Sequence, residues 1–449
     1  MIRNGKKKAI SCALVAAMSV GLAACGTTSY DFKVSYDGIK TGDVSSKVSV
    51  HDPSILKADG EYYIFGSHMS AAKSSDLLNW EKVADGYSKK NPVYGQIYDV
   101  ADKAFAYSGS KNSLIKTDDK QVHVWAPDVI YNETTGLYYM YYCTTSTWNA
   151  SNLCYGTSTT PEGPYEWQGA LIYSGFNRKT ISGTDVLDYV DEDYAYKNYI
   201  KGAQYNYEDY PNARDPTMFY DADGRMWMGY GSWSGGIFLL EIDKTTGLVI
   251  LPESDKANNV DPYYGKRLLG GGHISIEGPY IMYDETSGYY YLFVSYGALT
   301  SNGGYQVRVF RSKTVDGEYV DMNGKYPEKS AQHQNFGLKL TGNYKLPSLE
   351  KAYMATGHNS AFVDDDGRMY LVYHTRFNDN GEGHSPRVHQ MLVNEDGWPC
   401  ELPYQTQGET VNKDGYDADD IIGRYYVINH GTAIDSKIAK PVILYLENL

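Results

Sequence analysis

Five short polar motifs recur along the 449-residue sequence, and each contains one side chain suited to acid–base chemistry. In chain order these side chains are Asp52, Asp128, Asp215, Glu277 and His358. Carboxyl groups brought together repel one another and raise each other's pKa values, which costs stability and usually marks a functional site. Two carboxyls in opposite protonation states can hydrolyse a glycosidic bond, because one protonates the leaving oxygen while the other activates water or attacks the sugar. A third acid can raise the pKa of the proton donor.

The same motifs also have a structural explanation. Aspartate followed by proline, as in Asp52-Pro53 and Asp215-Pro216, favours a turn before a strand. One such pair by itself is better explained as a turn. The full set of five motifs favours a shared functional site.

Each motif leads into two short strands joined by a tight turn. In the first copy, the motif at residues 51–55 is followed by the turn Ala58-Asp59-Gly60 and by an aromatic strand at residues 62–66. The copies begin about 60 to 90 residues apart, which leaves room for four strands with their loops. The apolar runs are nearly continuous, as expected of strands buried on both faces. The sequence therefore predicts an all-β fold, a five-bladed β-propeller over residues 48–405.

A propeller gathers the starts of its innermost strands around one axis, so the five polar side chains are expected to converge on a single pocket. Two long stretches separate the repeats, at residues 81–124 and in the Tyr- and Asp-rich segment Asp185 to Tyr210. Insertions of this length belong on a surface, and commonly on the functional one.

The N-terminus carries an export signal. Basic residues within 1–8 precede an uncharged apolar stretch at 9–24, which is too short to be a convincing permanent membrane span. The stretch ends in Leu-Ala-Ala-Cys, which resembles the bacterial lipobox and predicts lipidation of Cys25. The alternative is an ordinary cleaved signal. With Cys25 lipidated, residues 1–24 are the signal and residues 25–47 form a tether. The protein is then expected at the extracellular face of the cell membrane.

The overall charge argues against nucleic acid as a partner. The formal net charge of −14 at pH 7 becomes more negative once residues 1–24, with four basic side chains and no acidic one, are removed. An acidic surface repels a polyphosphate backbone.

Cysteine use indicates neither a disulfide framework nor a zinc site. Only Cys143, Cys154 and Cys400 remain beyond the signal and the lipidation site. Cys143 and Cys154 could pair in an exported protein, and buried free thiols are the alternative.

The repeat pattern changes after residue 399. Residues 423–428 and 441–446 are predicted strands of another unit at 406–449. That unit is too short to fold alone. It is either part of an incomplete C-terminal β-domain or a set of strands that closes or packs on the propeller.

The motifs resemble those of glycoside hydrolase family 43 over residues 48–405. The matching segments are VHDPSI at 50–55, WAPDV at 125–129, NARDP at 212–216, IEGPY at 276–280 and GHNS at 357–360. The resemblance implies hydrolysis with inversion, with Asp52 as general base, Glu277 as general acid, and Asp215 as the residue that tunes and positions the acid. One departure is Arg214, because arabinan-cleaving relatives usually have a small or aliphatic residue there.

The resemblance also suggests residues that contact substrate. Asp128 is expected to be structural or to shape the substrate site rather than to be a fourth catalyst. Trp233 lies between glycines and serines, where an exposed indole could bury the apolar face of a sugar. Arg387 is expected to bind substrate, with a salt bridge as its alternative.

His358 resembles the central histidine that holds a hydrated metal ion, usually calcium, on the axis of arabinan-cleaving members. One imidazole is by itself a poor calcium ligand, since calcium prefers about six to eight oxygens, so water would supply most of the shell. A hydrogen-bonded core histidine is the alternative.

Three segments, at residues 231–235, 357–360 and 388–390, resemble the arabinan-cleaving branch of the family. Long Tyr-rich insertions and an exposed Trp233 would suit an open groove. The sequence thus predicts a monomer that cleaves α-1,5-linked arabinan in endo fashion. The alternatives are an exo-acting α-L-arabinofuranosidase or β-xylosidase of the same family, and a non-catalytic propeller that only binds glycans.

Overall fold

The computed structural model describes residues 46–118, 120–327, 333–378, 381–410, 412 and 414–446. The predicted signal, the lipidation site Cys25 and the tether up to residue 45 lie outside the described residues. Export and lipidation therefore stay predictions. Among the described residues, no helix combines the length and the apolar character needed to cross a bilayer.

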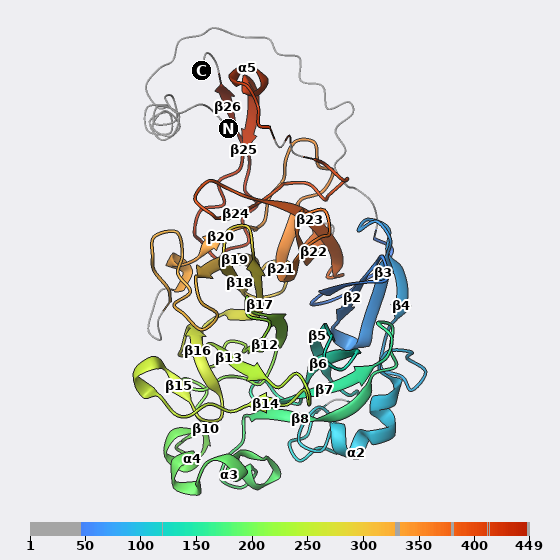
Figure 1. Ribbon diagram of the computed structural model, residues 1–449, viewed down its shortest axis with the longest axis vertical. Coiled ribbons are helices and arrows are strands. Elements are labelled where there is room, and N and C mark those ends of the chain that lie inside the picture. Colours follow the sequence, from blue (N-terminus) through green and yellow to red (C-terminus); the bar gives the residue numbers. More distant parts are fainter. Residues whose placement is uncertain are drawn as a thin grey trace.

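Five antiparallel sheets surround a central axis, and Figure 1 looks nearly along it. From the axis outward, blade 1 contains β1 (Ser54–Ala58), β2 (Glu61–Gly66), β3 (Ser70–Ser74) and β4 (Glu81–Ala84). Blade 2 contains β5 (Val124–Asn132), β6 (Leu137–Thr145), β7 (Ser151–Ser158) and β8 (Glu166–Ser174). Blade 3 contains β11 (Thr217–Tyr220), β12 (Met226–Tyr230), β13 (Ile237–Ile242), β16 (Gly265–Leu269) and β15 (Val260–Asp261), with β14 (Val249–Ile250) beside β13.

The last two blades have four strands each. Blade 4 contains β17 (Ile276–Asp284), β18 (Tyr289–Tyr296), β19 (Gln306–Ser312) and β20 (Leu338–Lys339). Blade 5 contains β21 (Tyr353–Val363), β22 (Met369–Phe377), β23 (Ser385–Val393) and β24 (Pro399–Glu401). The predicted all-β, five-bladed propeller is confirmed.

The innermost strands form a closed ring, in which β1, β5, β11, β17 and β21 each contact the next and β21 contacts β1. A repeated bond ties neighbouring blades: a side chain within one inner strand accepts a hydrogen bond from a backbone N–H of the next blade. The bonds run from Met218 to Asp128 (2.5 Å), from Ile55 to Ser360 (3.1 Å) and from Ala361 to Tyr280.

The core consists of apolar layers between blades. Tyr141 and Met228 are buried together between blades 2 and 3, and Phe293 and Leu371 between blades 4 and 5. Both faces of the inner strands are thus covered, which explains the nearly continuous apolar runs in the sequence.

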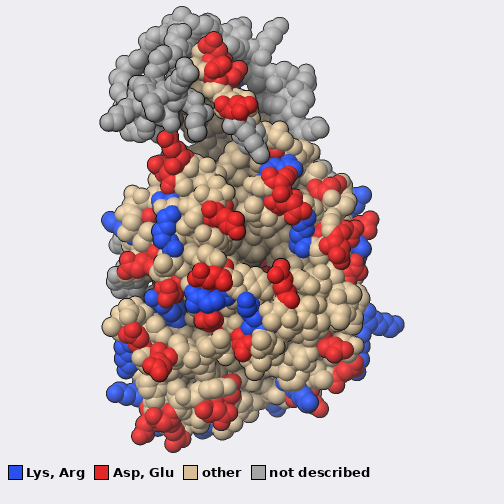
Figure 2. Space-filling view, in the orientation of Figure 1, with Lys and Arg blue, Asp and Glu red and all other residues tan. Residues whose placement is uncertain are grey.

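Helices are short and lie in the connections. They are η1 (Ser67–Met69), η2 (Gly95–Val100), α2 (Ala101–Ala104), η3 (Ile181–Gly183), α3 (Val186–Tyr189), α4 (Glu192–Asn198), η4 (Lys256–Asn258), η5 (His333–Asn335) and α5 (Ala418–Ile421). On the face that Figure 2 shows, acidic and basic side chains are interspersed.

The Tyr-rich segment Asp185 to Tyr210 differs from its expected role. It forms α3, α4 and a small hairpin of β9 (Ile200–Lys201) and β10 (Gln204–Tyr205), and the two helices lie at the periphery of the ring (Figure 1). Tyr199 is fully buried, and its hydroxyl donates to Asp261 Oδ1 over 2.8 Å. The helical part thus packs on blade 3, because tyrosine serves in a core as readily as on a sugar-binding surface.

The predicted C-terminal strands are confirmed as a hairpin of β25 (Gly423–Val427) and β26 (Val442–Leu446). The chain between them packs on blade 4. Arg308 donates to the carbonyl of Thr432 over 2.6 Å, and Lys339 and Gln306 donate to that of Ala433 over 3.0 and 3.1 Å.

Cys143, Cys154 and Cys400 are free thiols. Cys143 faces Leu153 across the ladder of β6 and β7, whereas Cys154 faces Tyr142. Neighbouring positions along a strand point to opposite sheet faces, so the first two thiols enter different core layers and cannot pair.

Candidate active site

Each blade has a residue with a left-handed backbone in its inner strand or just before it, and β21 has a second one at Ala355 (φ +48°). The φ angles are +56° at Asp52, +43° at Ala126, +52° at Asp215, +55° at Gly278 and +46° at His358. Residues other than glycine rarely adopt this conformation, and each one costs about 1–3 kcal/mol, so it persists only where its surroundings enforce it. The left-handed position recurs in all five blades and is strained in the four where it is not glycine, which is typical of a functional rim.

This geometry corrects the expected equivalence of the five polar residues. Asp52, Asp215 and His358 occupy the left-handed position of their blades. Glu277 directly precedes that position in blade 4, and Asp128 lies two residues beyond it in blade 2. Four of the five side chains therefore share a site, and Asp128 does not.

Gly278 makes room for His358. A Cβ atom on Gly278 would lie 3.0 Å from Cγ of the His358 ring, and the residue also has a positive φ. Because the imidazole fills the space that a side chain would take, blade 4 contributes its carboxyl group from the preceding residue, Glu277.

The carboxylate of Asp52 is held at both oxygens. Oδ1 lies 3.0 Å from His358 Nδ1, and Oδ2 accepts a hydrogen bond from Ser67 Oγ over 2.5 Å. Ser67 in turn accepts from the backbone N–H of Ala126 over 2.8 Å, which connects blade 2 to this carboxylate. Burial raises the pKa of Asp52, but the charges of His358 and His51 and the hydrogen bond to His358 together outweigh burial and hold the pKa well below its usual range. Asp52 is therefore ionised.

His358 is the positive partner of that carboxylate. Burial lowers the pKa of His358, but the charge of Asp52 and the hydrogen bond to it raise the pKa to about 9. The backbone N–H of His358 donates to Ser295 Oγ over 2.7 Å, which fixes the strained residue in place.

Glu277 has the opposite protonation state. Burial, followed by the charge of Asp215, raises the pKa of Glu277 to about 7. Trp233 Nε1 and Ser232 Oγ both donate to Glu277 Oε2, over 2.7 and 3.2 Å. Trp233 is thus half-buried and holds the acid in place, where sequence reasoning had expected an exposed platform for sugar.

Asp215 is near enough to both Asp52 and Glu277 to interact with their charges. Burial raises its pKa; Asp52 adds to the rise, whereas His358 and Arg214 oppose it. Its Oδ2 accepts a hydrogen bond from the backbone N–H of Gly278 over 3.3 Å. A carboxyl group beside Glu277 disfavours ionisation of Glu277, which keeps a proton available there near neutral pH.

Comparison with known proteins agrees with this geometry. The family model described as glycosyl hydrolases family 43 matches residues 44–210 and 204–399. The chain belongs to family 43. It is therefore a glycoside hydrolase.

Relatives in family 43 match most of the chain. The extracellular endo-α-(1→5)-L-arabinanase of Thermotoga petrophila is 39% identical over 412 residues, which cover 89% of this chain and 79% of the relative. The extracellular endo-α-(1→5)-L-arabinanase 2 of Bacillus subtilis is 36% identical over 429 residues, covering 90% and 80%. A crystal structure of the Thermotoga petrophila endo-1,5-α-L-arabinanase matches with a TM-score of 0.74 at 38% identity, over 89% of this chain and 83% of that one.

Arg214, the departure from the family 43 pattern, turns away from the acids. Its Nε donates to Ser151 Oγ over 2.8 Å, and its guanidinium lies 5.1 Å from the centre of the Trp125 ring. The guanidinium also donates hydrogen bonds to Thr145 Oγ1 and to the Thr147 carbonyl. The cation thus supports the blade beside the site.

Asp128 and Arg387 do not join the acids. Asp128 is 3% exposed, and both its oxygens accept hydrogen bonds within the ring of inner strands, from Ser54 and Met218 among others. Of its two expected roles, this geometry fits the structural one. Arg387 donates to its neighbour Pro386 O over 2.8 Å and lies 4.9 Å above the Phe377 ring, so it packs within blade 5 and not in the axial site.

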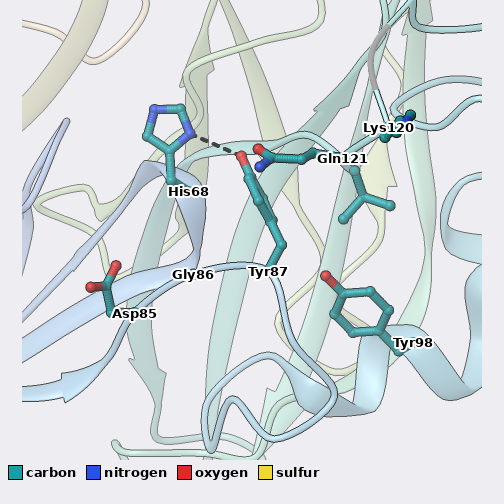
Figure 3. A pocket seen from close by; sticks show the side chains of 8 residues that line it. His68, Asp85, Gly86, Tyr87, Tyr98, Lys120 and Gln121 are labelled. Carbon is teal, nitrogen blue, oxygen red and sulfur yellow. Dashed lines mark hydrogen bonds between the residues drawn. The ribbon is translucent and has the colours of Figure 1, made fainter.

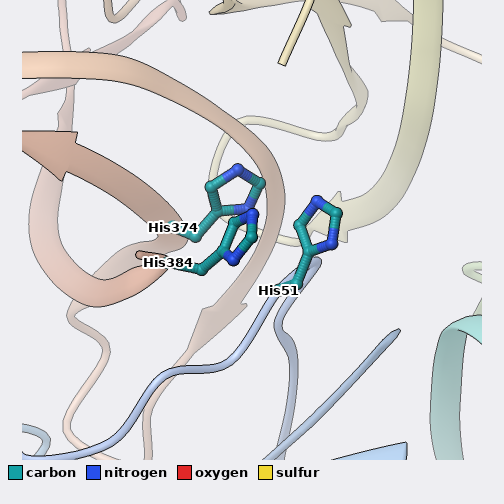
Figure 4. A group of neighbouring side chains, drawn as sticks. All are labelled: His51, His374 and His384. Atoms are coloured by element: carbon teal, nitrogen blue, oxygen red, sulfur yellow. The ribbon is translucent and has the colours of Figure 1, made fainter. Parts of the chain in front are cut away.

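Sequence reasoning missed a group of histidines behind Asp52, shown in Figure 4. Nitrogens of His51, His374 and His384 lie within 4.8 Å of one another. His51 Nε2 is 3.2 Å from Asp52 Oδ1, and His374 Nδ1 accepts from the Asp52 backbone N–H over 3.3 Å. Burial lowers the pKa of His51 to about 4 and that of His384 to about 3, so these rings form a neutral wall.

This histidine group is poorly arranged for a metal ion. The rings of His51 and His384 stack with their centres 3.9 Å apart and their planes at 24°. Stacking points their in-plane lone pairs side by side, whereas a zinc ion needs ligands that converge from tetrahedral directions. Only His51 lay in a motif; His374 and His384 reach the site through closure of blade 5 on blade 1.

The expected calcium ion at His358 fits only through water. Nδ1 of His358 faces Asp52, and the Asp52 oxygens are also engaged by Ser67 and His51. Only after His358 gives up its proton do these groups leave one free imidazole nitrogen, and calcium requires about six to eight oxygens. A hydrated ion is compatible with this donor set.

Proposed function

We propose that this family 43 hydrolase cleaves arabinan with inversion, with Asp52 as general base and Glu277 as general acid. Asp215 keeps the acid protonated and positions it. The observation that carries the proposal is the contrast in protonation between the two carboxyls, since the pKa of Asp52 is well below its usual range and that of Glu277 is about 7. Glycoside hydrolysis requires this contrast.

The base acts on water in this scheme. Ser67 and His358 hold the two oxygens of Asp52, so that the ionised group can orient a water molecule and accept its proton. Glu277, oriented by Trp233, gives its proton to the leaving oxygen. Inversion places the water opposite the leaving group and requires the carboxyls to be about 6.5–9.5 Å apart.

Two relatives named as endo-arabinanases support α-1,5-linked arabinan as the substrate. Endo cleavage is favoured because the helices of the Asp185 to Tyr210 segment pack on the outer edge of blade 3 and do not cover the axis. An exo-acting arabinofuranosidase or β-xylosidase of the family has the same three acids and is the competing function.

The proposal extends to the setting of the enzyme. It acts outside the cell as a monomer, attached to the membrane by a lipid on Cys25. The relatives' description as extracellular and the apolar N-terminal stretch support this location. A hydrated calcium ion at His358 would add positive charge beside the acids.

Product analysis tests the proposal. The purified protein is incubated with linear α-1,5-arabinan, branched arabinan and xylan, and early products are separated by chromatography while viscosity is followed. The proposal predicts mixed arabino-oligosaccharides and a fast fall in viscosity on linear arabinan. Single arabinose or xylose units from the first minutes would favour the exo alternative, and no cleavage of any polymer would reject a catalytic role.

A further inference from the structure

A recess of about 480 Å³ opens beside the axial site, between blades 1 and 2. Its lining includes His68, Asp85, Tyr87, Tyr98 and Gln121 (Figure 3). Ligand pockets commonly have volumes of about 300–1,000 Å³, so the recess is large enough for a small ligand or part of a chain. None of the catalytic side chains lines it.

The recess lies on the same face as the acids. His68 belongs to the connection that follows β2, where the backbone N–H of Ser67 donates to the His51 carbonyl over 2.9 Å beside the catalytic Asp52. Tyr87 follows the end of β4 and Gln121 precedes the start of β5, and strand alternation brings both to this end of their blades. A chain lying across the axial site can therefore reach the recess.

A line of hydrogen-bonded rings connects the recess to the base. Asp52 Oδ1 lies 3.2 Å from His51 Nε2, and His51 Nδ1 lies 3.4 Å from His68 Nε2. His68 Nδ1 and the Tyr87 hydroxyl share a hydrogen bond of 2.9 Å. The recess thus begins two imidazole rings away from the group that activates water, so a ligand there would sit beyond the sugar that reacts.

The lining is held in a defined shape. His68 and Met69 both have left-handed backbones, with φ of +65° and +61°. Met69 is fully buried, and its carbonyl accepts a hydrogen bond from Asn91 Nδ2 over 2.8 Å. The Tyr87 ring packs edge-on against His68, at 86° between planes. Two consecutive strained residues persist only where the surroundings enforce them, and such strain clusters at ligand sites.

We propose that this recess is a distal subsite that binds a further sugar unit of the polysaccharide, an inference that rests on the proposed function. Figure 3 shows the polar ends of His68, Tyr87 and Gln121 close together, with Asp85 and Tyr98 to either side. Aromatic rings cover the apolar C–H faces of a sugar, and amide, imidazole and carboxylate groups bind its hydroxyls. The lining contains one acidic and one basic side chain, Asp85 and Lys120, so it carries no net formal charge and suits a neutral sugar.

Chain length provides the test. We measure kcat/KM for linear arabino-oligosaccharides of increasing length. The readout is the ratio of kcat/KM for the longest oligosaccharide to kcat/KM for the shortest one that is cleaved. Tyr87→Ala is expected to lower this ratio about tenfold, which corresponds to the loss of one aromatic contact. Tyr131→Ala is the matched control, because Tyr131 is an exposed tyrosine (41%) at the end of β5 that lies away from the recess. It should leave the ratio unchanged.

Other outcomes are equally decisive. An unchanged ratio in Tyr87→Ala, or an equal loss at every length, overturns the subsite. If Tyr87→Ala does not fold, as judged by its melting temperature, Gln121→Ala takes its place with the same expected direction. A wild-type enzyme that cleaves xylan and not arabinan rejects the proposed substrate, while the same ratio on xylo-oligosaccharides still tests the recess. A protein that cleaves no glycan chain rejects both.

Discussion

The indole Nε1 of Trp233 donates a hydrogen bond to Glu277 Oε2 over 2.7 Å. Trp233 comes from the connection between β12 and β13 of blade 3, and Glu277 from the inner strand of blade 4. The bond therefore orients the proposed acid from a neighbouring blade. It also favours the ionised form of Glu277, against the burial and the charge of Asp215 that raise its pKa.

Trp233→Phe tests this relationship, because the ring is kept and the N–H donor is lost. A hydrogen bond to a charged group contributes about 1.5–3 kcal/mol, so kcat should fall by roughly 10- to 100-fold. The pKa of Glu277 should rise, which moves the alkaline limb of the pH profile to higher pH. A variant with wild-type kcat and an unmoved limb would contradict the assigned role.

Asp52→Asn and Glu277→Gln test the two proposed catalytic groups. Each should lower kcat by about 10² to 10⁴, the usual contribution of general acid–base catalysis. Steady-state rates on linear arabinan measure the effect, and circular dichroism verifies that each variant is folded. Wild-type turnover in either one would remove that residue from the mechanism.

Asp128→Ala distinguishes an acid with a structural role from the acids that we propose as catalytic. The change leaves the buried N–H of Met218 and the hydroxyl of Ser54 without their acceptor. An unsatisfied buried group costs about 1–3 kcal/mol, and the free energy of unfolding in urea should fall by about that amount. We expect kcat of the folded variant to stay near the wild-type value; a large loss of kcat with normal stability would place Asp128 in the chemistry after all.

The pH profile of kcat/KM should be asymmetric. Glu277 acts in its protonated form, so activity is present below its pKa of about 7 and is lost as the pH rises through that value. Asp52 acts in its ionised form, and its pKa lies well below the usual range, so activity on the acid side should persist to pH values below those typical of an aspartate. A profile whose alkaline limb lies near pH 5 would be inconsistent with Glu277 as acid.

Metal removal tests the proposed calcium ion. Prolonged dialysis against a chelator should lower kcat, and calcium should restore it more effectively than magnesium, because calcium accepts about six to eight ligands in flexible arrangements whereas magnesium demands near-ideal octahedral geometry. Full activity in metal-free protein would instead indicate that protonated His358 supplies the positive charge beside Asp52 by itself.

The five-bladed architecture could be predicted because its signals are local. A turn with glycine between two apolar runs recurs in each blade, as at Gly60 and Gly136, and the spacing of the copies fits four strands. The acids Asp52, Asp215 and Glu277 could be found for the same reason, since each belongs to a short motif at the start of a repeat.

Other features depended on contacts that the sequence does not reveal. Ala126 adopts a left-handed backbone although alanine gives no signal for one, so the displacement of Asp128 from the pocket could not be predicted from the spacing of the motifs. His374 and His384 reach Asp52 only because blade 5 closes on blade 1. The tyrosine-rich composition of residues 185–210 fits either a core or a sugar-binding surface. The burial of Tyr199 shows that this tyrosine belongs to the core.

The configuration of the first product tests the central claim most directly. Proton NMR during the first minutes of hydrolysis of linear α-1,5-arabinan reports the anomer before mutarotation mixes the two forms. If Asp52 activates water opposite the leaving oxygen protonated by Glu277, the new reducing ends appear first as the β-anomer and belong to oligosaccharides. First appearance of the α-anomer would mean retention, which requires a carboxylate nucleophile and contradicts the roles assigned here.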